Sequence, residues 1–301
     1  MTAFRRFARR MTVTILIIGC VLVAGWFSFR AGRERLMGMR PQRVPVVRPA
    51  DLDASSLRDV AFRTADGLLL RGWYAPSRNR AAVVLAHGYQ ANRTQHLPEA
   101  RLLMQAGYGV LLFDFRAQGE SEGDHLSFGD RERGDVRAAI DFVAAQPDVA
   151  KGHLGALGFS AGSAPVALVS ADDQRVRAVV IESTSTSIRD ALRDWGGRLG
   201  WLRAAGALFL LRASGIDVPA MRTDLAVARL SPRPLLLVHG DEEPQKLQAR
   251  MRQLYDAASQ PKRLIAVRGA AHGKFLQAPG ADEYGRELLA FFDAALRGAT
   301  P

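Results

Sequence analysis

Short apolar runs alternate with longer amphipathic segments through most of the chain. The runs are rich in leucine, β-branched and aromatic residues, and they cover residues 59–64, 68–75, 81–87, 110–116, 153–159, 178–183, 234–240 and 263–269. Segments of helical length, such as 130–146 and 244–258, lie between the later runs. Near-continuously apolar strands separated by helices are typical of a parallel sheet covered on both faces. The pattern therefore predicts an α/β domain that opens with an antiparallel hairpin around Asp66–Gly67.

The alternation is interrupted between residues 185 and 230. Helical sequence that includes Trp195, Trp201 and Phe209 replaces a single crossover there, which predicts a helical cap inserted over the strand ends. From Leu199 to Leu211 the apolar residues have a spacing that groups several of them on one side of a helix. This side either packs on the body alone or also lines a substrate pocket, and we expect it to shape an acyl pocket.

The N-terminal segment differs from the rest of the chain. Residues 11–29 are uncharged and mostly apolar, and as a helix they would extend about 28 Å, close to the thickness of a bilayer's hydrocarbon core. We therefore predict a single-pass membrane anchor in residues 1–30, a membrane localisation, an Arg- and Pro-rich linker in 31–56 and a folded body in 57–301. A cleaved signal peptide is the main alternative, although an A-x-A site is missing. Arg clusters flank both ends of the apolar run, so the sequence does not select a membrane face.

The formal net charge of +11 arises mainly at the N-terminus, because residues 1–48 hold ten Arg and one Glu. The rest has an ordinary charge balance and no basic stretch interleaved with aromatics, which argues against a nucleic-acid partner. Cys20 is the single cysteine, which excludes an intrachain disulfide and a cysteine metal site. The residues after Cys20 stay apolar, unlike those of a mature lipoprotein. We expect no metal and no other cofactor, and the sequence does not indicate an oligomeric state.

A G-x-S-x-G pattern at Gly158–Gly162 supplies the first candidate for chemistry. The pattern alone is a modest signal, because a glycine turn can hold an incidental serine. Its context strengthens it, since an apolar run ends directly at Ser160 and the residues that follow can form a helix. A strand, a tight turn and a helix expose a serine as a nucleophile. We therefore predict Ser160 as the nucleophile.

His87-Gly88-Tyr89 follows an earlier apolar run, at the place where such a fold supplies a backbone N–H to an oxyanion. The amides of Tyr89 and Ala161 are the predicted oxyanion donors. His87, together with Gly88, is expected to support this loop through a buried hydrogen bond rather than to transfer protons.

His272 lies just beyond the last apolar run, in a loop of small residues. A nucleophilic serine needs a neutral imidazole within hydrogen-bond reach, so His272 is the predicted base. A carboxylate should orient the imidazole, and it should precede His272 in the chain. Asp241, Glu242 and Glu243 all follow the penultimate run. Chemistry alone does not choose among these three acids.

From Val60 to Leu296 the chain resembles α/β-hydrolases of the serine-aminopeptidase and monoglyceride-lipase-like branch, including its single-pass membrane members. The matching motifs are HGYQANR, FDFRAQGESEG, FGDRERGDVRAAIDFV and, at His239-Gly240, the start of H-G-x-x-D. The resemblance implies an α/β-hydrolase fold and places the acid at Glu243, with Asp241 as the alternative. The chain departs from the common H-G-x-x-D pattern of these hydrolases, because Glu243 replaces the aspartate and the usual Val-Pro is absent. It also implies scaffold roles for Asp114, Arg116, Gly119, Ser121 and Asp135.

These motifs predict a serine hydrolase that acts through an acyl-enzyme, of the carboxylesterase or lipase-like class. The expected substrate is an ester with a lipid-like or other apolar acyl group. A dehalogenase of this fold would need an aspartate in place of Ser160. A serine peptidase or aminopeptidase and a thioesterase are the alternatives within the fold. A catalytically silent, membrane-anchored binding or scaffold protein is an alternative from another class, which the missing aspartate and Val-Pro motivate.

Overall fold

The computed structural model describes residues 39–52, 57–195 and 200–297, together with the isolated positions 11, 16, 18 and 19. The strands are β1 (Arg58–Arg63), β2 (Leu69–Ala75), β3 (Ala82–Ala86), β4 (Gly109–Phe113), β5 (Leu154–Phe159), β6 (Val176–Glu182), β7 (Leu235–Gly240) and β8 (Lys262–Val267). The α-helices are α2 (Leu97–Gln105), α3 (Glu132–Ala144), α4 (Ser163–Asp172), α5 (Ile188–Trp195), α6 (Gly200–Ala213), α7 (Thr223–Ala228), α8 (Gln245–Ala257) and α9 (Ala281–Leu296). Short 3₁₀ turns are η1 (Arg93–His96), η2 (Ser160–Gly162), η4 (Val218–Ala220) and η5 (Phe275–Gln277).

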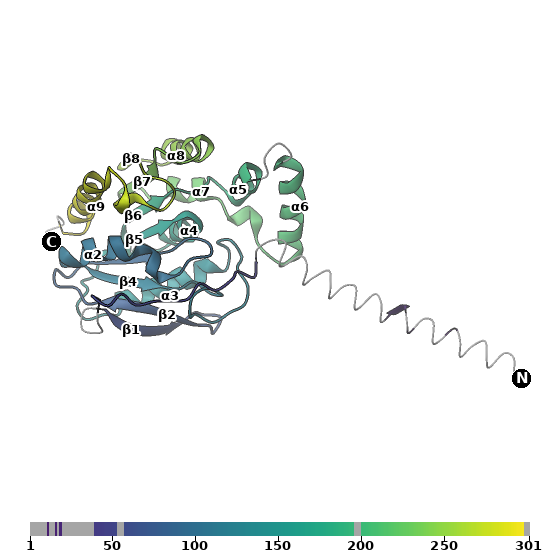
Figure 1. The fold of residues 1–301 in the computed structure, drawn as a ribbon, viewed down its shortest axis with the longest axis horizontal. Helices are drawn as coiled ribbons and strands as arrows, with labels where there is room; N and C mark the ends of the chain where they lie inside the picture. Colours follow the sequence, from purple (N-terminus) through teal and green to yellow (C-terminus); the bar gives the residue numbers. More distant parts are fainter. Residues whose placement is uncertain are drawn as a thin grey trace, which may run out of the picture. The chain divides into compact units, whose positions relative to one another are not determined.

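The strands form one sheet in the order β1-β2-β4-β3-β5-β6-β7-β8 (Figure 1). The strands from β3 to β8 run parallel, whereas β2 pairs antiparallel with both β1 and β4. All of the predicted strand runs therefore occur, and the antiparallel opening hairpin is confirmed. This is the α/β-hydrolase fold that the sequence predicts.

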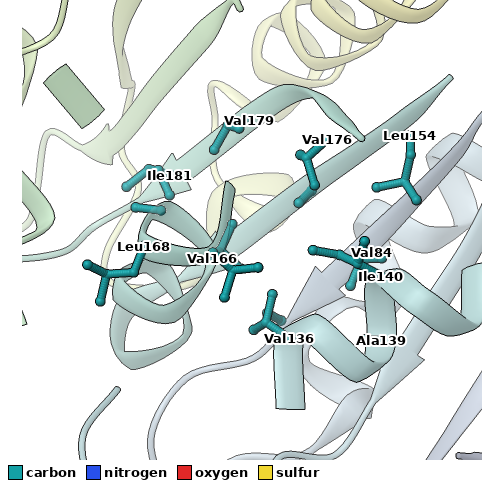
Figure 2. Close-up of a cluster of buried hydrophobic side chains, with 14 of the residues drawn as sticks. Val84, Val136, Ala139, Ile140, Leu154, Val166, Leu168, Val176, Val179 and Ile181 are labelled. Atoms are coloured by element: carbon teal, nitrogen blue, oxygen red, sulfur yellow. The ribbon is translucent and has the colours of Figure 1, made fainter. Parts of the chain in front are cut away.

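Helices cover both faces of the sheet and create two apolar cores. On one face the sheet packs against α3, α4, α7 and α8, and Figure 2 shows part of this core, where Val84 and Leu154 of the sheet lie near Ile140 of α3. On the other face the sheet packs against α2 and α9. Because both faces are covered, β3 and β5 are buried at every position, which explains why these strands read as continuous apolar runs.

The parallel strands end at one edge of the sheet, and the interruption predicted at 185–230 follows β6 there. Helices α5, α6 and α7 and the turn η4 come between β6 and β7 in the chain (Figure 1). Helix α6 buries Leu208 and Leu211 but leaves Phe209 69% exposed. The side of this helix that faces the protein is therefore narrower than its apolar composition suggests.

The prediction of a membrane-spanning helix, and with it of a membrane localisation, is corrected by the structure. No helix in its described part combines the length and the apolar character that crossing a bilayer requires. Most of the predicted segment, residues 12–15, 17 and 20–29, lies outside the described residues.

Part of the segment predicted as a linker lies against the body. The Arg43 guanidinium donates hydrogen bonds to carbonyl oxygens of the loop 118–123, with distances of 2.7 Å to Ser121 O and 2.8 Å to Gly123 O. The Asn92 side chain donates to the carbonyl oxygens of Val44 and Pro45, at 3.0 and 3.1 Å. Residues 43–45 therefore contact the loops that follow β3 and β4.

Candidate active site

The turn between β5 and α4 holds Ser160 in a strained backbone conformation. Its φ is +51°, in the left-handed region that a non-glycine residue rarely adopts. The flanking glycines make this turn possible. A Cβ on Gly158 would lie 2.7 Å from Gly162 O, and one on Gly162 would lie 2.4 Å from His87 O. Larger side chains would force the turn away from β3, so the close approach explains the G-x-S-x-G pattern.

His272 lies between the serine and a carboxylate. Its Nε2 is 3.1 Å from Ser160 Oγ, and its Nδ1 is 2.7 Å from Glu243 Oε1. An ionised carboxylate only accepts hydrogen bonds, so Nδ1 carries the proton and Nε2 can accept the hydroxyl hydrogen of Ser160. The three side chains come from loops after β5, β7 and β8, which end at the same edge of the sheet. The structure thus brings together the residues predicted as nucleophile, base and acid.

The two candidate acids lie in different surroundings. The Glu243 side chain is fully buried, and its Oε2 accepts a hydrogen bond from Gly240 N at 3.3 Å. Asp241 is exposed, and its Oδ1 accepts from Gly269 N at 2.7 Å. Asp241 therefore braces the loop that leads from β8 toward His272, whereas Glu243 contacts the imidazole itself.

The predicted oxyanion loop lies directly beside Ser160. A Cβ built on Gly88 would be 3.4 Å from the Cβ of Ser160, and both Tyr89 and Ala161 line the cavity at the serine. Gly88 N donates to the Gln95 side chain at 2.8 Å, which fixes the loop's course. The structure therefore brings both predicted oxyanion residues to the serine.

His87 occupies a buried position that binds two backbone groups. Its Nδ1 donates to Gly88 O at 2.8 Å, and its Nε2 accepts from Phe115 N at 3.1 Å. Burial lowers the pKa of His87 to about 3, so the imidazole is neutral at physiological pH. Both ring nitrogens are occupied, so His87 supports the loop and has no free nitrogen for proton transfer.

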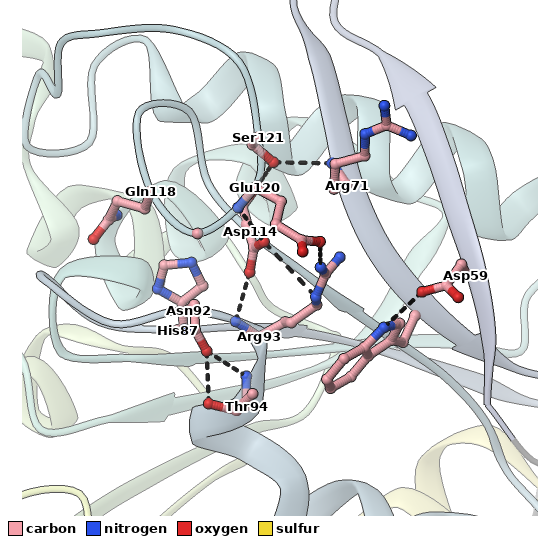
Figure 3. Close-up of polar contacts among 12 residues, drawn as sticks. Asp59, Arg71, His87, Asn92, Arg93, Thr94, Asp114, Gln118, Glu120 and Ser121 are labelled. Carbon is pink, nitrogen blue, oxygen red and sulfur yellow. Dashed lines mark hydrogen bonds and ion pairs between the residues drawn. The ribbon is translucent and has the colours of Figure 1, made fainter. Parts of the chain in front are cut away.

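Asp114 connects the oxyanion loop to the turn after β4 (Figure 3). Its carboxylate accepts from Arg93 N at 2.7 Å and from Glu120 N at 2.9 Å. Ser121 Oγ donates to Asp114 O at 2.6 Å and accepts from Arg71 N at 2.9 Å. These contacts agree with the scaffold roles that the resemblance implies.

Gly119 and the pair of Arg116 with Asp135 complete this scaffold. A Cβ on Gly119 would lie 2.2 Å from Asp114 Oδ2, so only glycine fits beside that carboxylate. Arg116 Nη2 donates to Asp135 Oδ1 at 2.7 Å, and Arg116 Nε donates to the same atom at 2.9 Å. Since the Asp135 side chain is fully buried, this ion pair ties the loop after β4 to helix α3.

A cavity of about 480 Å³ opens at Ser160. It is lined by Tyr89, Gln95, Phe128, Phe159, Ser160, Ala161, Ala164, Ser183, Thr184, Ser185, Ser187, Ile188, Ala191, Met221, Thr223, Pro244, Leu247 and His272. Among these described residues there is no Asp, Glu, Lys or Arg. The cavity therefore suits an uncharged, largely apolar substrate.

The cap contributes to this cavity through a different helix than expected. Ile188 and Ala191 of α5 line it, together with Met221 and Thr223. Neither residue 201 nor any residue from 204 to 211 is among the lining residues, whereas Leu199 and the side chains at positions 202 and 203 lie outside the described part. The prediction that this segment shapes the acyl pocket is therefore wrong for the described residues, because α6 buries Leu208 and Leu211 elsewhere and turns Phe209 to solvent.

Several residues at the site are absent from the sequence-based prediction. The Phe159 ring lies 4.7 Å from the His272 ring, centroid to centroid, and so packs against the base. Gln95 fixes Gly88, and Ser183 lines the cavity. Phe159 lies within the G-x-S-x-G pattern and Gln95 lies just beyond HGYQANR, but neither motif reveals where these side chains point. Ser183 ends an apolar run and carries no motif.

A buried polar cluster lies behind Phe159. The Tyr284 hydroxyl donates to Glu182, and Glu99 contacts His96 Nδ1 at 3.3 Å. Burial, reinforced by the negative charge of Glu99, raises the pKa of the Glu182 carboxyl to about 8. These groups do not line the cavity. Across the described ranges, no group of three or more His, Cys, Asp or Glu is arranged to hold a metal ion.

Comparison with known families gives one match that covers more than half of the chain. The model of the X-Pro dipeptidyl-peptidase (S15) family matches residues 68–231. This range includes the oxyanion loop, Ser160 and the cap, and it ends before Glu243 and His272.

Individual proteins extend the comparison. The uncharacterised protein YfhR of Escherichia coli K12 is 29% identical over 252 residues, which cover 81% of this chain and 83% of YfhR. The thiohydrolase aneE of Aspergillus aculeatus is 35% identical over 134 residues, 43% of this chain and 42% of aneE. Among solved structures, the esterase Pf2001 of Pyrococcus furiosus superposes with a TM-score of 0.67 at 22% identity, covering 85% of this chain and 99% of Pf2001.

Proposed function

The chain belongs to the X-Pro dipeptidyl-peptidase (S15) family, within the α/β-hydrolase superfamily, and we propose that it is a serine hydrolase that cleaves uncharged carboxylic esters. The observation that carries this proposal is the contact of Ser160 with His272, and of His272 with Glu243, at the mouth of a cavity without charged lining residues in the described part. The esterase fold of Pf2001 is consistent with it.

The proposed reaction is acyl transfer to water. Ser160 Oγ attacks the ester carbonyl carbon while His272 Nε2 takes the hydroxyl proton, and the amides of Tyr89 and Ala161 stabilise the oxyanion. The imidazolium then gives its proton to the leaving alcohol as the C–O bond breaks. Water, deprotonated by His272, attacks the acyl-enzyme, and the acid product and the free serine result. Glu243 stabilises the imidazolium and holds its tautomer in both halves of the reaction.

The lining of the cavity supports an ester over an aminopeptidase substrate. An aminopeptidase must accept the ammonium group of a peptide, and a buried ammonium needs a carboxylate partner. The described lining residues offer none. The apolar side chains of Phe128, Ile188 and Leu247 instead suit an acyl chain. The acyl group is therefore proposed to be lipid-like or otherwise apolar.

Two observations favour other acyl substrates as second candidates. The matching family is named for a peptidase, so hydrolysis of a peptide bond is the first of these. The relative aneE is named a thiohydrolase, which favours a thioester. The motif resemblance to the serine-aminopeptidase and monoglyceride-lipase-like branch allows both peptides and lipid esters.

We expect purified protein to hydrolyse p-nitrophenyl isobutyrate with a kcat/KM at least tenfold above that for the p-nitrophenyl ester of alanine. These two esters have nearly the same shape, but the second carries an ammonium group, for which the described lining residues offer no carboxylate. The p-nitroanilide of alanyl-proline and S-phenyl thiobutyrate extend the comparison to an amide and a thioester. A higher kcat/KM for the alanine ester or the anilide would favour a peptidase instead.

A further inference from the structure

We propose that Ser183 forms a polar subsite that selects esters with a hydroxyl or carbonyl group close to the scissile bond. This inference rests on the proposed function and adds a substrate feature to it. Ser183 follows the last residue of β6, and Glu182 of β6 pairs with Phe159 of β5. Ser160 and Ser183 are thus the first residues beyond two neighbouring parallel strands, whose backbones lie about 4.8 Å apart.

Ser183 shares the unusual backbone conformation of Ser160. Its φ is +45°, and that of Ser160 is +51°. Such strain in a non-glycine residue persists only where the surroundings enforce it, and it concentrates at functional sites. The backbone of Ser183 is held by its N–H, which donates to Val238 O at 2.9 Å. The strand ends therefore fix Ser183 in place beside the nucleophile.

The hydroxyl of Ser183 has no partner within the described protein. Its Oγ is buried and makes no hydrogen bond to any described residue, although the residue lines the cavity. A buried polar group without a hydrogen bond is unfavourable, and this atom is closed to solvent, so the hydroxyl gains a hydrogen bond when it rotates about Cα–Cβ toward a substrate in the cavity that the residue lines. By contrast, the hydroxyl of Ser187, which also lines the cavity, already donates to Asp190 at 2.8 Å.

The chemistry of the group that Ser183 would bind follows from its surroundings. A serine hydroxyl both donates and accepts, so it can pair with a hydroxyl or a carbonyl. The described cavity lining offers no counter-charge for an ion, and Thr184, Ser185 and Thr223 add further neutral hydroxyls to it. A substrate with a neutral hydrogen-bonding group near its ester bond therefore fits this part of the cavity.

The test uses pairs of esters in which a hydroxyl group in one member replaces a methyl group in the other. On the acyl side these are p-nitrophenyl 3-hydroxybutyrate and p-nitrophenyl 3-methylbutyrate, and on the alcohol side they are 2-hydroxyethyl butyrate and propyl butyrate. Ser183→Ala removes the hydroxyl, and Ser183→Gly removes it while also accepting the positive φ. Ser170→Ala is the matched control, because Ser170 Oγ is also buried without a described partner but lies outside the cavity.

We expect wild type to prefer the hydroxylated ester in at least one pair, and both Ser183 variants to lower that preference by about five- to tenfold in kcat/KM. Ser170→Ala should leave the preference unchanged. An equal loss on both members of each pair, or no loss on either, would overturn the subsite.

A binding measurement separates this proposal from the proposed function. In Ser160→Ala protein, the hydroxylated ester of at least one pair should raise the melting temperature more than its methyl counterpart does. The two comparisons are 2-hydroxyethyl butyrate with propyl butyrate, and p-nitrophenyl 3-hydroxybutyrate with p-nitrophenyl 3-methylbutyrate. Adding Ser183→Gly should abolish the difference. If wild type hydrolyses none of the esters but this difference is present, the proposed function fails while the subsite stands. If no pair differs in binding, the subsite fails.

Discussion

Glu243→Gln is expected to lower kcat for p-nitrophenyl isobutyrate by about 10⁴-fold. The glutamine amide has no charge to stabilise the imidazolium. Its NH₂ group can also donate to His272 Nδ1, which would place the imidazole proton on Nε2. In that tautomer Nε2 cannot accept the proton of Ser160, although the 2.7 Å contact with residue 243 could persist. Steady-state kinetics on the purified variant would measure the loss.

Asp241→Asn is the matched control for this prediction. Asp241 lies two residues from Glu243 and is the other candidate acid, but its Oδ1 contacts Gly269 N rather than the imidazole. We expect its kcat to stay within about tenfold of wild type, because an asparagine oxygen can still accept that backbone hydrogen bond. A larger loss in Asp241→Asn than in Glu243→Gln would assign the acid to Asp241.

Asp135→Ala is expected to lower the free energy of unfolding by about 3–5 kcal/mol. The substitution leaves Arg116 buried without the carboxylate that accepts from its Nε, its Nη2 and its backbone N–H. Removing one member of a buried ion pair strands the other charge, which costs more than the net value of the pair. Urea unfolding followed by circular dichroism would measure the change.

Asp66→Ala provides the comparison, because Asp66 contacts the same guanidinium from the surface. Its carboxylate lies 2.9 Å from Arg116 Nη1, and its side chain is 55% exposed. Water replaces an exposed partner, so we expect a loss of at most about 1 kcal/mol. Similar losses of unfolding free energy in the two variants would show that the buried ion pair of Arg116 with Asp135 stabilises the protein no more than the exposed contact with Asp66 does.

The strands and the glycine turn that holds Ser160 could be predicted because local sequence determines them. Buried parallel strands must be apolar at every position, so β3 and β5 are visible as runs. Gly158 and Gly162 are required by backbone contacts within a few residues of Ser160 or with β3. The position of His272 just beyond the last strand followed from the alternation of apolar runs and amphipathic segments along the chain.

Features that depend on long-range placement could not be predicted in this way. The choice between Glu243 and Asp241 depends on how two loops meet, and residue chemistry alone left it open. The apolar composition of α6 does not reveal that Phe209 faces solvent while α5 lines the cavity. The carbonyl oxygens that receive Arg43 lie more than seventy positions away, and no sequence pattern records that contact.

Labelling with a fluorophosphonate probe tests the central proposal most directly, since the probe reacts only with an activated serine nucleophile. Folded wild-type protein should be labelled on Ser160, as located by peptide mass spectrometry, and Ser160→Ala should not be labelled. Circular dichroism on both samples would establish that they are folded. Folded wild type that remains unlabelled, or a label that persists in Ser160→Ala, would contradict the assignment of Ser160 as the nucleophile of a serine hydrolase.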